Sequence, residues 1–306
     1  HGCHCRRVHG AASFYGIVGL GDLEKRLPMR SFFRFFILDL IEGTIRRHGC
    51  LALMVATSIV LSIAFSIRVS DASWSHAASF GDRCVAFTMG CSSYRKEFGE
   101  PFEFPVEWAS FMMTALYATL RYPLQSLSNG GEKLLIAGGN RWSWWLAKVV
   151  WTVVQVLLYC VIAALVAAVF CLLSGGSLSF DISPELMELY RYTGTRLSHQ
   201  GMSGSPYCAF AVVCLVAMCL FQLMVSVAVH PIASFGVMLA LLFASSFSSL
   251  PVFFGCYAMA LRSGFFMADG IGGAAGCAFL AAIAVVSVVL GGICFGRYDV
   301  VGERYE

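Results

Sequence analysis

Thiol and imidazole side chains gather at the start of the chain, where their types match those of metal ligands. They are His1, Cys3, His4, Cys5 and His9. A metal site also needs fixed geometry and supporting contacts, and a Cys-x-Cys pair at a chain end provides neither. We therefore interpret this cluster as adventitious and predict no metal site.

A second pattern, Gly201-Met202-Ser203-Gly204, has the GxSG spacing of the nucleophile in intramembrane serine proteases. Such a serine needs a histidine base within hydrogen-bond reach. His230 lies at the far end of the apolar segment that follows Ser203, roughly 35 to 40 Å away at 1.5 Å per residue. His199 is nearer but lies in a polar segment. The pattern favours a Gly-Ser linker, and we expect this chain not to be an enzyme.

The sequence also lacks a motif that would cradle a nucleotide. Gly130-Gly131-Glu132-Lys133 has neither the spacing of a phosphate-binding loop nor the Ser or Thr that should follow its Lys. The net charge of +3 gives no indication of a nucleic-acid face. We predict no cofactor in this chain and no nucleic-acid partner.

Polar side chains inside apolar segments are further candidates, because such groups are costly in lipid. Gln155 and Gln222 are the candidates for a substrate path, although a Gln in a membrane helix more often joins two helices. Glu107 and Arg121 lie near the two ends of one segment, about 21 Å apart along a helix. We expect both to be interfacial anchors.

The elements that must position these residues follow from composition. Of the 306 residues, 58% are hydrophobic and only 13% are charged, too few to cover a water-exposed surface. A bilayer core of roughly 30 Å needs about 20 apolar residues in a helix. The sequence predicts an all-α, polytopic membrane protein with six transmembrane helices, at residues 50–67, 106–124, 149–173, 207–229, 232–250 and 271–295.

Three features interrupt or precede these helices. Residues 31–47 mix phenylalanines with charges, which predicts an amphipathic helix on the cytoplasmic surface. His230 and Pro231 leave room only for a tight turn. Pro251 breaks the fifth apolar run, so residues 252–261 should form a re-entrant or interfacial piece covered by protein. Gly272 and Gly276 make a GxxxG step suited to close helix packing.

The charges set the orientation and the domain limits. Most Lys and Arg residues fall on the side of the N-terminus, which predicts that both termini are cytoplasmic in a plasma membrane. Residues 31–296 should form one transmembrane domain, flanked by cytoplasmic tails at 1–30 and 297–306. Met29 would make a natural start, so we expect residues 1–28 to be dispensable. In the first outward segment, Cys84 and Cys91 form either a disulfide or a pair of free thiols.

The cytoplasmic loop at residues 125–148 carries the most specific pattern. Ser128 and Asn129 can cap a short helix that begins near Gly131. Its apolar residues would face water, which calls for a partner surface. The residues expected to contact that partner are Glu132, Lys133, Leu134, Leu135, Ile136, Gly138 and Arg141.

This order of an acidic residue, an apolar turn, Gly138-Gly139, Arg141, a Trp-rich stretch and Lys148 resembles the coupling-helix region of type-2 ATP-binding-cassette exporter permeases. The predicted order of spans, turn and broken element is also similar to that family. The resemblance implies a permease subunit, with ATP bound by a separate ATPase subunit, a second permease chain as partner, membrane lipids around it and an unidentified exported substrate. The alternatives are a secondary transporter or channel without an ATPase, or a membrane assembly factor.

Overall fold

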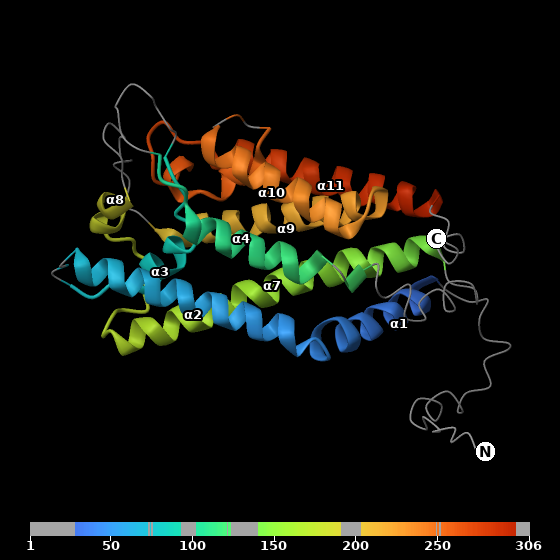
Figure 1. Cartoon of the computed structure of the whole chain (residues 1–306), viewed down its shortest axis with the longest axis horizontal. Helices are drawn as coiled ribbons and strands as arrows, with labels where there is room; N and C mark the ends of the chain where they lie inside the picture. Colours follow the sequence, from blue (N-terminus) through green and yellow to red (C-terminus); the bar gives the residue numbers. More distant parts are fainter. Residues whose placement is uncertain are drawn as a thin grey trace, which may run out of the picture.

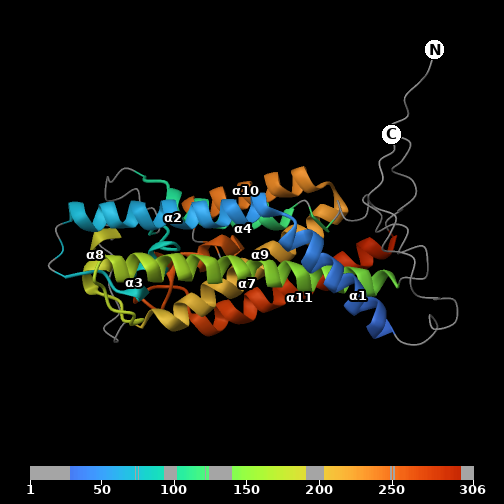
Figure 2. The ribbon, with the colours of Figure 1, turned by 90° about the horizontal axis from the view of Figure 1, so that it is seen from below.

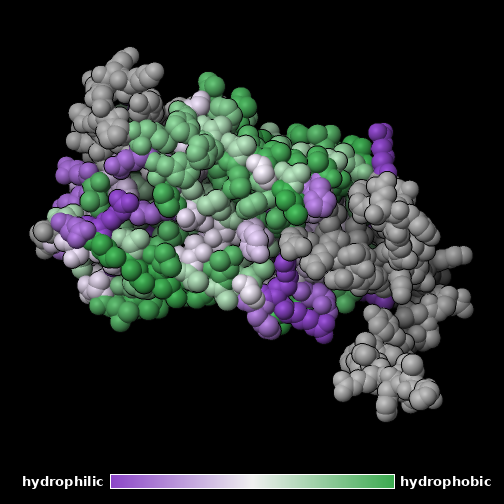
Figure 3. Space-filling model, viewed as in Figure 1, coloured by the Kyte–Doolittle hydropathy of each residue, from purple (hydrophilic) through white to green (hydrophobic). Residues whose placement is uncertain are grey.

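The computed structural model describes residues 28–72, 74, 76–92, 102–120, 122–123, 140–190, 203–248, 250 and 252–297. Within these ranges the chain is all-α, with nine α-helices and no strand beyond two isolated bridges. The longer helices run along the long axis of the molecule as one bundle (Figure 1 and Figure 2). Hydrophobic residues cover the middle of one face, and hydrophilic residues gather toward its ends (Figure 3).

Four of these helices are long and apolar enough to cross a membrane. They are α2 (His48–Asp71), α7 (Arg141–Leu173), α9 (Gly204–Ala228) and α11 (Gly273–Arg297). Each covers one of the predicted spans except for at most two of its residues, because a continuous apolar run can satisfy its backbone in lipid only as a helix. The chain is thus a multi-pass membrane protein by the length and composition of its helices.

The second and fifth predicted spans are shorter helices. α4 covers Val106–Leu120 with 15 residues, and α10 covers Pro231–Phe247 with 17 residues. At 1.5 Å per residue these helices are about 22 and 26 Å long. The prediction placed the end of the fifth span at Leu250, and α10 ends earlier, at Phe247. Residues 122–123 are helical too, and the predicted end of the second span at Leu124 lies outside the described residues.

The helix of the third predicted span, α7, begins eight residues before Val149, where that span was predicted to start. Asn140 caps it, since its side chain accepts a hydrogen bond from the Trp142 N–H at 2.9 Å. The extra two turns carry the tryptophans and Lys148 into the helix. Only the apolar part was visible as a span, because the Trp-rich turns contain charges.

The amphipathic segment before α2 is helical, as predicted. It consists of α1 (Pro28–Leu40) and a π-helical turn, η1 (Ile41–Ile45). Several large apolar side chains on it remain exposed, including Phe33, Ile37 and Ile45. Such a face is typical of a helix that lies on a membrane surface. However, Asp39 points into the protein and is only 3% exposed.

The tight turn between α9 and α10 forms as expected. His230 caps α10 through its imidazole, which accepts a hydrogen bond from the Ile232 N–H at 3.3 Å, and Pro231 occupies the first helical position. A proline suits that position because its missing N–H would have no partner there.

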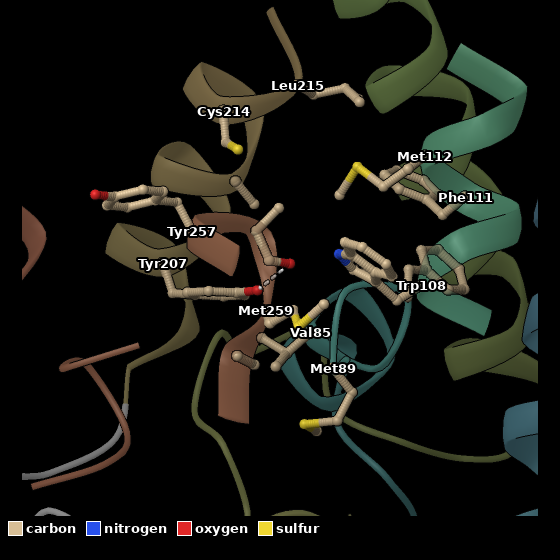
Figure 4. Close-up of a cluster of buried hydrophobic side chains, with 14 of the residues drawn as sticks. Val85, Met89, Trp108, Phe111, Met112, Tyr207, Cys214, Leu215, Tyr257 and Met259 are labelled. Carbon is tan, nitrogen blue, oxygen red and sulfur yellow. Dashed lines mark hydrogen bonds between the residues drawn. The ribbon is translucent and has the colours of Figure 1, made fainter. Parts of the chain in front are cut away.

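The broken element between α10 and α11 consists of two 3-10 turns, η4 (Phe254–Ala258) and η5 (Ala260–Arg262). Their residues are buried, so the irregular backbone is covered by protein, as the sequence required. Tyr207 of α9 points at this element in Figure 4, and its hydroxyl lies 3.0 Å from the Thr88 carbonyl and 3.1 Å from the Ala258 carbonyl.

Two short helices, α3 (Phe80–Ala86) and α8 (Pro184–Tyr190), lie at the end of the bundle opposite α1 (Figure 1). Ser79 and Asp82 form a capping box at the start of α3. The Asp82 carboxylate also accepts hydrogen bonds from the N–H and the hydroxyl of Ser183, at 2.9 and 2.7 Å. Asp82 thereby joins the segment between α2 and α4 to the segment between α7 and α9.

Candidate functional site

The most polar buried site lies where α1 packs on the first turns of α7. Asp39 of α1 and Lys148 of α7 form an ion pair, and their side chains are 4% and 2% exposed. The Tyr122 hydroxyl donates a second hydrogen bond to the same Asp39 oxygen, at 2.9 Å. The Lys148 ammonium also lies over the rings of Tyr122 and Trp144, 4.8 and 4.9 Å from their centroids. We call Asp39, Tyr122, Trp144 and Lys148 the α1–α7 lock.

In the α1–α7 lock, burial disfavours the charged form of the Asp39 carboxylate. Burial raises the pKa of the Asp39 carboxyl, and the Lys148 ammonium counteracts part of that rise. The second carboxylate oxygen of Asp39 is buried and finds no hydrogen-bond donor among the described residues. A buried pair of this kind contributes little net stability, but it is costly to break from one side.

The π-helical turn extends the contact between α1 and α7. The Thr44 hydroxyl donates to the Gln155 side chain at 3.0 Å and lies 3.2 Å from the Trp151 indole nitrogen, which donates to it. Gly43 is required here, because a Cβ at this position would meet the rings of Tyr122 and Trp151. Gln155, a candidate for the substrate path, therefore binds η1 in this structure.

Gln222, the other candidate for the substrate path, joins two helices of the core. Its side-chain amide donates to the Leu116 carbonyl of α4 at 3.0 Å. Its own oxygen is buried and has no donor among the described residues. Gln222 and Gln155 are each 1% exposed, and neither lines the apolar cavity between α3, α4, α7 and α9.

Of the residues predicted to contact an ATPase, Glu132, Lys133, Leu134, Leu135, Ile136 and Gly138 lie outside the described residues. Arg141 is described. Its guanidinium donates to the Gly296 carbonyl at 2.8 Å and so connects the start of α7 to the end of α11.

Two of the tryptophans next to Arg141, Trp144 and Trp145, are buried. Trp144 stacks on Phe295 with centroids 4.3 Å apart, and the Trp145 indole donates to the Val288 carbonyl at 2.8 Å. Gly291 and Gly292 of α11 leave room for Trp145 and Trp142. These glycines make the close approach between α7 and α11 possible.

The predicted GxxxG step contributes only one of its residues to packing. Gly276 lies against Phe210 and Tyr257, whereas no atom would contact a Cβ at Gly272. Gly272 precedes the first residue of α11, Gly273, so only Gly276 lies on the helix.

At the other end of the bundle, Glu107 joins three elements. It accepts a hydrogen bond from the Arg68 guanidinium at 2.8 Å and another from the Tyr190 hydroxyl at 3.1 Å. Arg68 also lies over the Tyr190 ring, 5.2 Å from its centroid. Burial raises the pKa of Tyr190, so its hydroxyl stays protonated and remains a donor. Arg121, the second predicted anchor, lies outside the described residues.

Cys84 and Cys91 are free thiols in this structure, and their surroundings differ. Cys84 lies on α3, next to a cavity. Cys91 is buried beside Arg262, whose guanidinium donates to the Cys91 carbonyl at 2.9 Å. Arg262 is 4% exposed and also donates to the Ser246 and Ser248 carbonyls at the end of α10, at 2.7 and 2.9 Å. No carboxylate pairs with Arg262 in the described part of the chain, and sequence reasoning gave it no role.

Among the described residues, Ser203 of the GxSG pattern has no histidine partner. Ser203 precedes α9 and lies 3.2 Å from the Ser205 hydroxyl, while His230 follows the other end of this 25-residue helix. Gly201, His199 and the metal-like cluster at residues 1–9 lie outside the described residues. Among the residues that are described, no group of His, Cys, Asp or Glu could hold a metal ion.

Comparison of the whole chain with family models, curated proteins and solved structures finds no match. The functional argument therefore depends on the chain itself. The structure supports a multi-pass, all-α membrane protein in which the α1–α7 lock joins the surface helix to a long apolar helix.

Proposed function

We propose that this chain is the membrane-spanning permease subunit of a type-2 ATP-binding-cassette exporter. In this proposal all six apolar helices, α2, α4, α7, α9, α10 and α11, cross a plasma membrane, with both termini in the cytoplasm. A second permease chain completes the substrate path, and a separate ATPase subunit binds ATP. The chain itself carries out no covalent chemistry.

One observation carries the proposal. Asp39 of the surface helix contacts Tyr122 and Lys148, which lie on opposite sides of the loop at residues 124–139. In this proposal a force on the loop passes to α1 from both of its flanks, through Tyr122 on one side and Lys148 on the other. This is the arrangement needed for a motor protein that grips the loop to move the surface helix and two spans as one body.

The order of elements agrees with the same proposal. A surface helix precedes the first span, the turn after the fourth is very short, and two 3-10 turns separate the fifth from the sixth. α10 is about 26 Å long, close to the thickness of a bilayer core, and the buried turns η4 and η5 follow it in the chain. Transport would proceed by rigid-body switching between two states that the ATPase biases.

The test uses the loop residues that should enter the ATPase. The chain is purified from its native membranes, any ATPase that co-purifies with it is identified, and ATP hydrolysis by the complex is measured. Changing Leu134→Asp and Leu135→Asp together should abolish co-purification and stimulated hydrolysis, because two charges would enter an apolar contact. The matched control is Leu178→Asp, an exposed residue at the opposite end of the bundle.

Retained binding of the ATPase by the double variant would contradict the coupling assignment. Loss of binding with the control variant as well would show that charge alone disturbs the protein. If the native chain transports without any ATPase, the secondary transporter or channel becomes the better description.

A further inference from the structure

An apolar cavity of about 230 Å³ lies between α3, α4, α7 and α9, toward the end of the bundle that carries α3 and α8. Its walls are formed by aromatic rings, small aliphatic side chains and three thiols: Phe80, Cys84, Phe87, Thr88, Phe111, Cys160, Ala163, Ala164, Phe180, Cys208, Ala209, Ala211, Val212 and Leu215. Phe111 and Leu215 belong to the buried cluster drawn in Figure 4. Neither Gln155 nor Gln222 lines this cavity.

The chemistry of the walls excludes a polar occupant. The Thr88 hydroxyl, the strongest hydrogen-bonding side chain present, turns back to the Val85 carbonyl at 3.3 Å. Burial raises the pKa of the Cys84 thiol, so it remains neutral, and neutral thiols behave as small hydrophobes. Water needs two to four polar partners to occupy a cavity, and these walls do not provide them.

The cavity opens sideways. Ala209 and Phe180 on its rim are exposed, and Val212 is half-buried. They continue into the exposed apolar faces of α7, at Val161 and Leu165, and of α9, at Val213. These faces belong to two of the helices long enough to cross a membrane. The opening therefore faces lipid.

The size of the cavity suits a short length of hydrocarbon chain. An apolar cavity of about 150 Å³ is large enough to hold benzene. On that scale, the present cavity has room for on the order of eight carbon atoms. The side chains that line an empty cavity of this size lack dispersion contacts on one side. An alkyl chain from the adjacent lipid that enters the cavity provides these contacts.

The rim also offers a place for a head group. Ser203 and Ser205, whose hydroxyls are 3.2 Å apart, are exposed at the start of α9. Ser177 is exposed on the strand-like segment that leads to Phe180. An amphiphile whose alkyl chain is bound in the cavity would thus leave its polar head group among hydroxyl groups.

From these observations we infer that the cavity is a binding site for the alkyl chain of a membrane amphiphile, which enters from the lipid between α7 and α9. The inference depends on the chain spanning a membrane and is independent of the exporter assignment. Since lipid is as apolar as the cavity, we expect defined occupancy of this site and no large gain in affinity over bulk lipid.

The experiment maps where an alkyl chain resides. The full chain is placed in phospholipid nanodiscs that contain phosphatidylglycerol with a photoreactive diazirine on its acyl chain. After illumination, the labelled residues are identified by mass spectrometry. A second sample contains a diazirine-bearing free fatty acid instead. Labelling should concentrate on the lining residues of α7 and α9, above all Cys160 and Cys208.

Two matched variants separate the cavity from the general lipid-facing surface. Val212→Trp places a large ring in the cavity and should reduce labelling at Cys160 several-fold. Val213→Trp is its control, because Val213 is 40% exposed on the same helix and does not line the cavity. If the Val212 variant fails to fold, Ala209→Phe at the rim replaces it.

Enriched labelling of the cavity by either probe supports the site. Labelling by the phospholipid identifies a two-chain amphiphile as the occupant, and labelling by the fatty acid identifies a single-chain one. Labelling spread evenly over Val161, Leu165 and the lining residues would overturn the inference. So would equal labelling in the Val212 and Val213 variants.

Discussion

At the scale of single residues, two buried cations, Lys148 and Arg262, are held in different ways. Lys148 has a carboxylate partner in Asp39, whereas Arg262 is satisfied by backbone carbonyls and no described carboxylate. The difference follows from what surrounds each cation. Lys148 lies between two helices with complete backbone hydrogen bonds, and Arg262 lies at a helix end that leaves its carbonyls open.

The α1–α7 lock gives a prediction at this scale. Asp39→Asn leaves the Lys148 ammonium buried without a counter-charge, which should cost on the order of 3 kcal/mol or more. Asp39→Leu combined with Lys148→Met removes both charges and should restore most of that loss, since apolar residues of similar size are often tolerated in place of a buried pair.

The measurement is the thermal unfolding midpoint of the purified protein in detergent. Glu42→Gln is the control, because Glu42 pairs with Arg46 on the exposed surface of η1. A double variant as unstable as the single one would show that the unpaired buried charge is not the cause of the loss.

At the scale of elements, the irregular segment between α10 and α11 depends on Arg262. Its guanidinium replaces the backbone N–H groups that a further helical turn would have provided, since it donates to the carbonyls at the end of α10. A cation at a helix C-terminus is also favoured by the helix dipole. The same side chain reaches the segment after α3 through Cys91.

We therefore expect Arg262→Met to loosen this part of the molecule. Each buried carbonyl left without a donor costs about 1 to 3 kcal/mol, so several of them should make the variant clearly less stable. Limited proteolysis should cut the variant between α10 and α11 before any other site. Arg297→Met, at the exposed end of α11, serves as the control. An unchanged cleavage pattern in the Arg262 variant would contradict this role.

At the scale of the whole molecule, the two ends of the bundle differ in construction. One end joins α1 to α7 and α11 through charged and aromatic side chains. The other end is built from two short helices and the segments around them, joined by Asp82 and Glu107. Figure 2 shows the long helices spanning the distance between these ends. A membrane would lie across the apolar part between them.

The orientation is tested by labelling from one side. In intact cells, Leu178→Cys should react with a membrane-impermeant maleimide, because this exposed residue follows the far end of α7. His230→Cys, in the turn at the other end, should react only after the membrane is opened. The unchanged chain gives the background from its native thiols. The reverse pattern would invert the proposed topology, and labelling of both from outside would contradict the number of crossings.

The sequence by itself determined which segments are helical in the core of this protein. Long apolar runs have one way to satisfy their backbone in lipid, so the positions of α2, α7, α9 and α11 could be read from composition. Pro231 and Pro251 marked the turn and the break for the same local reason, since proline cannot continue a helix. The short helices α3 and α8 escaped notice because their stability comes from bonds between distant segments, such as Asp82 to Ser183.

The tertiary structure alone decided which side chains meet. Asp39 and Lys148 lie in separate predicted elements, and no periodicity relates them. Cys91 was considered with Cys84, yet folding places it beside Arg262, and Cys84 lines a cavity with Cys160 and Cys208. The physical reason is that local sequence sets the backbone of each helix, whereas the packing of helices against one another sets its neighbours.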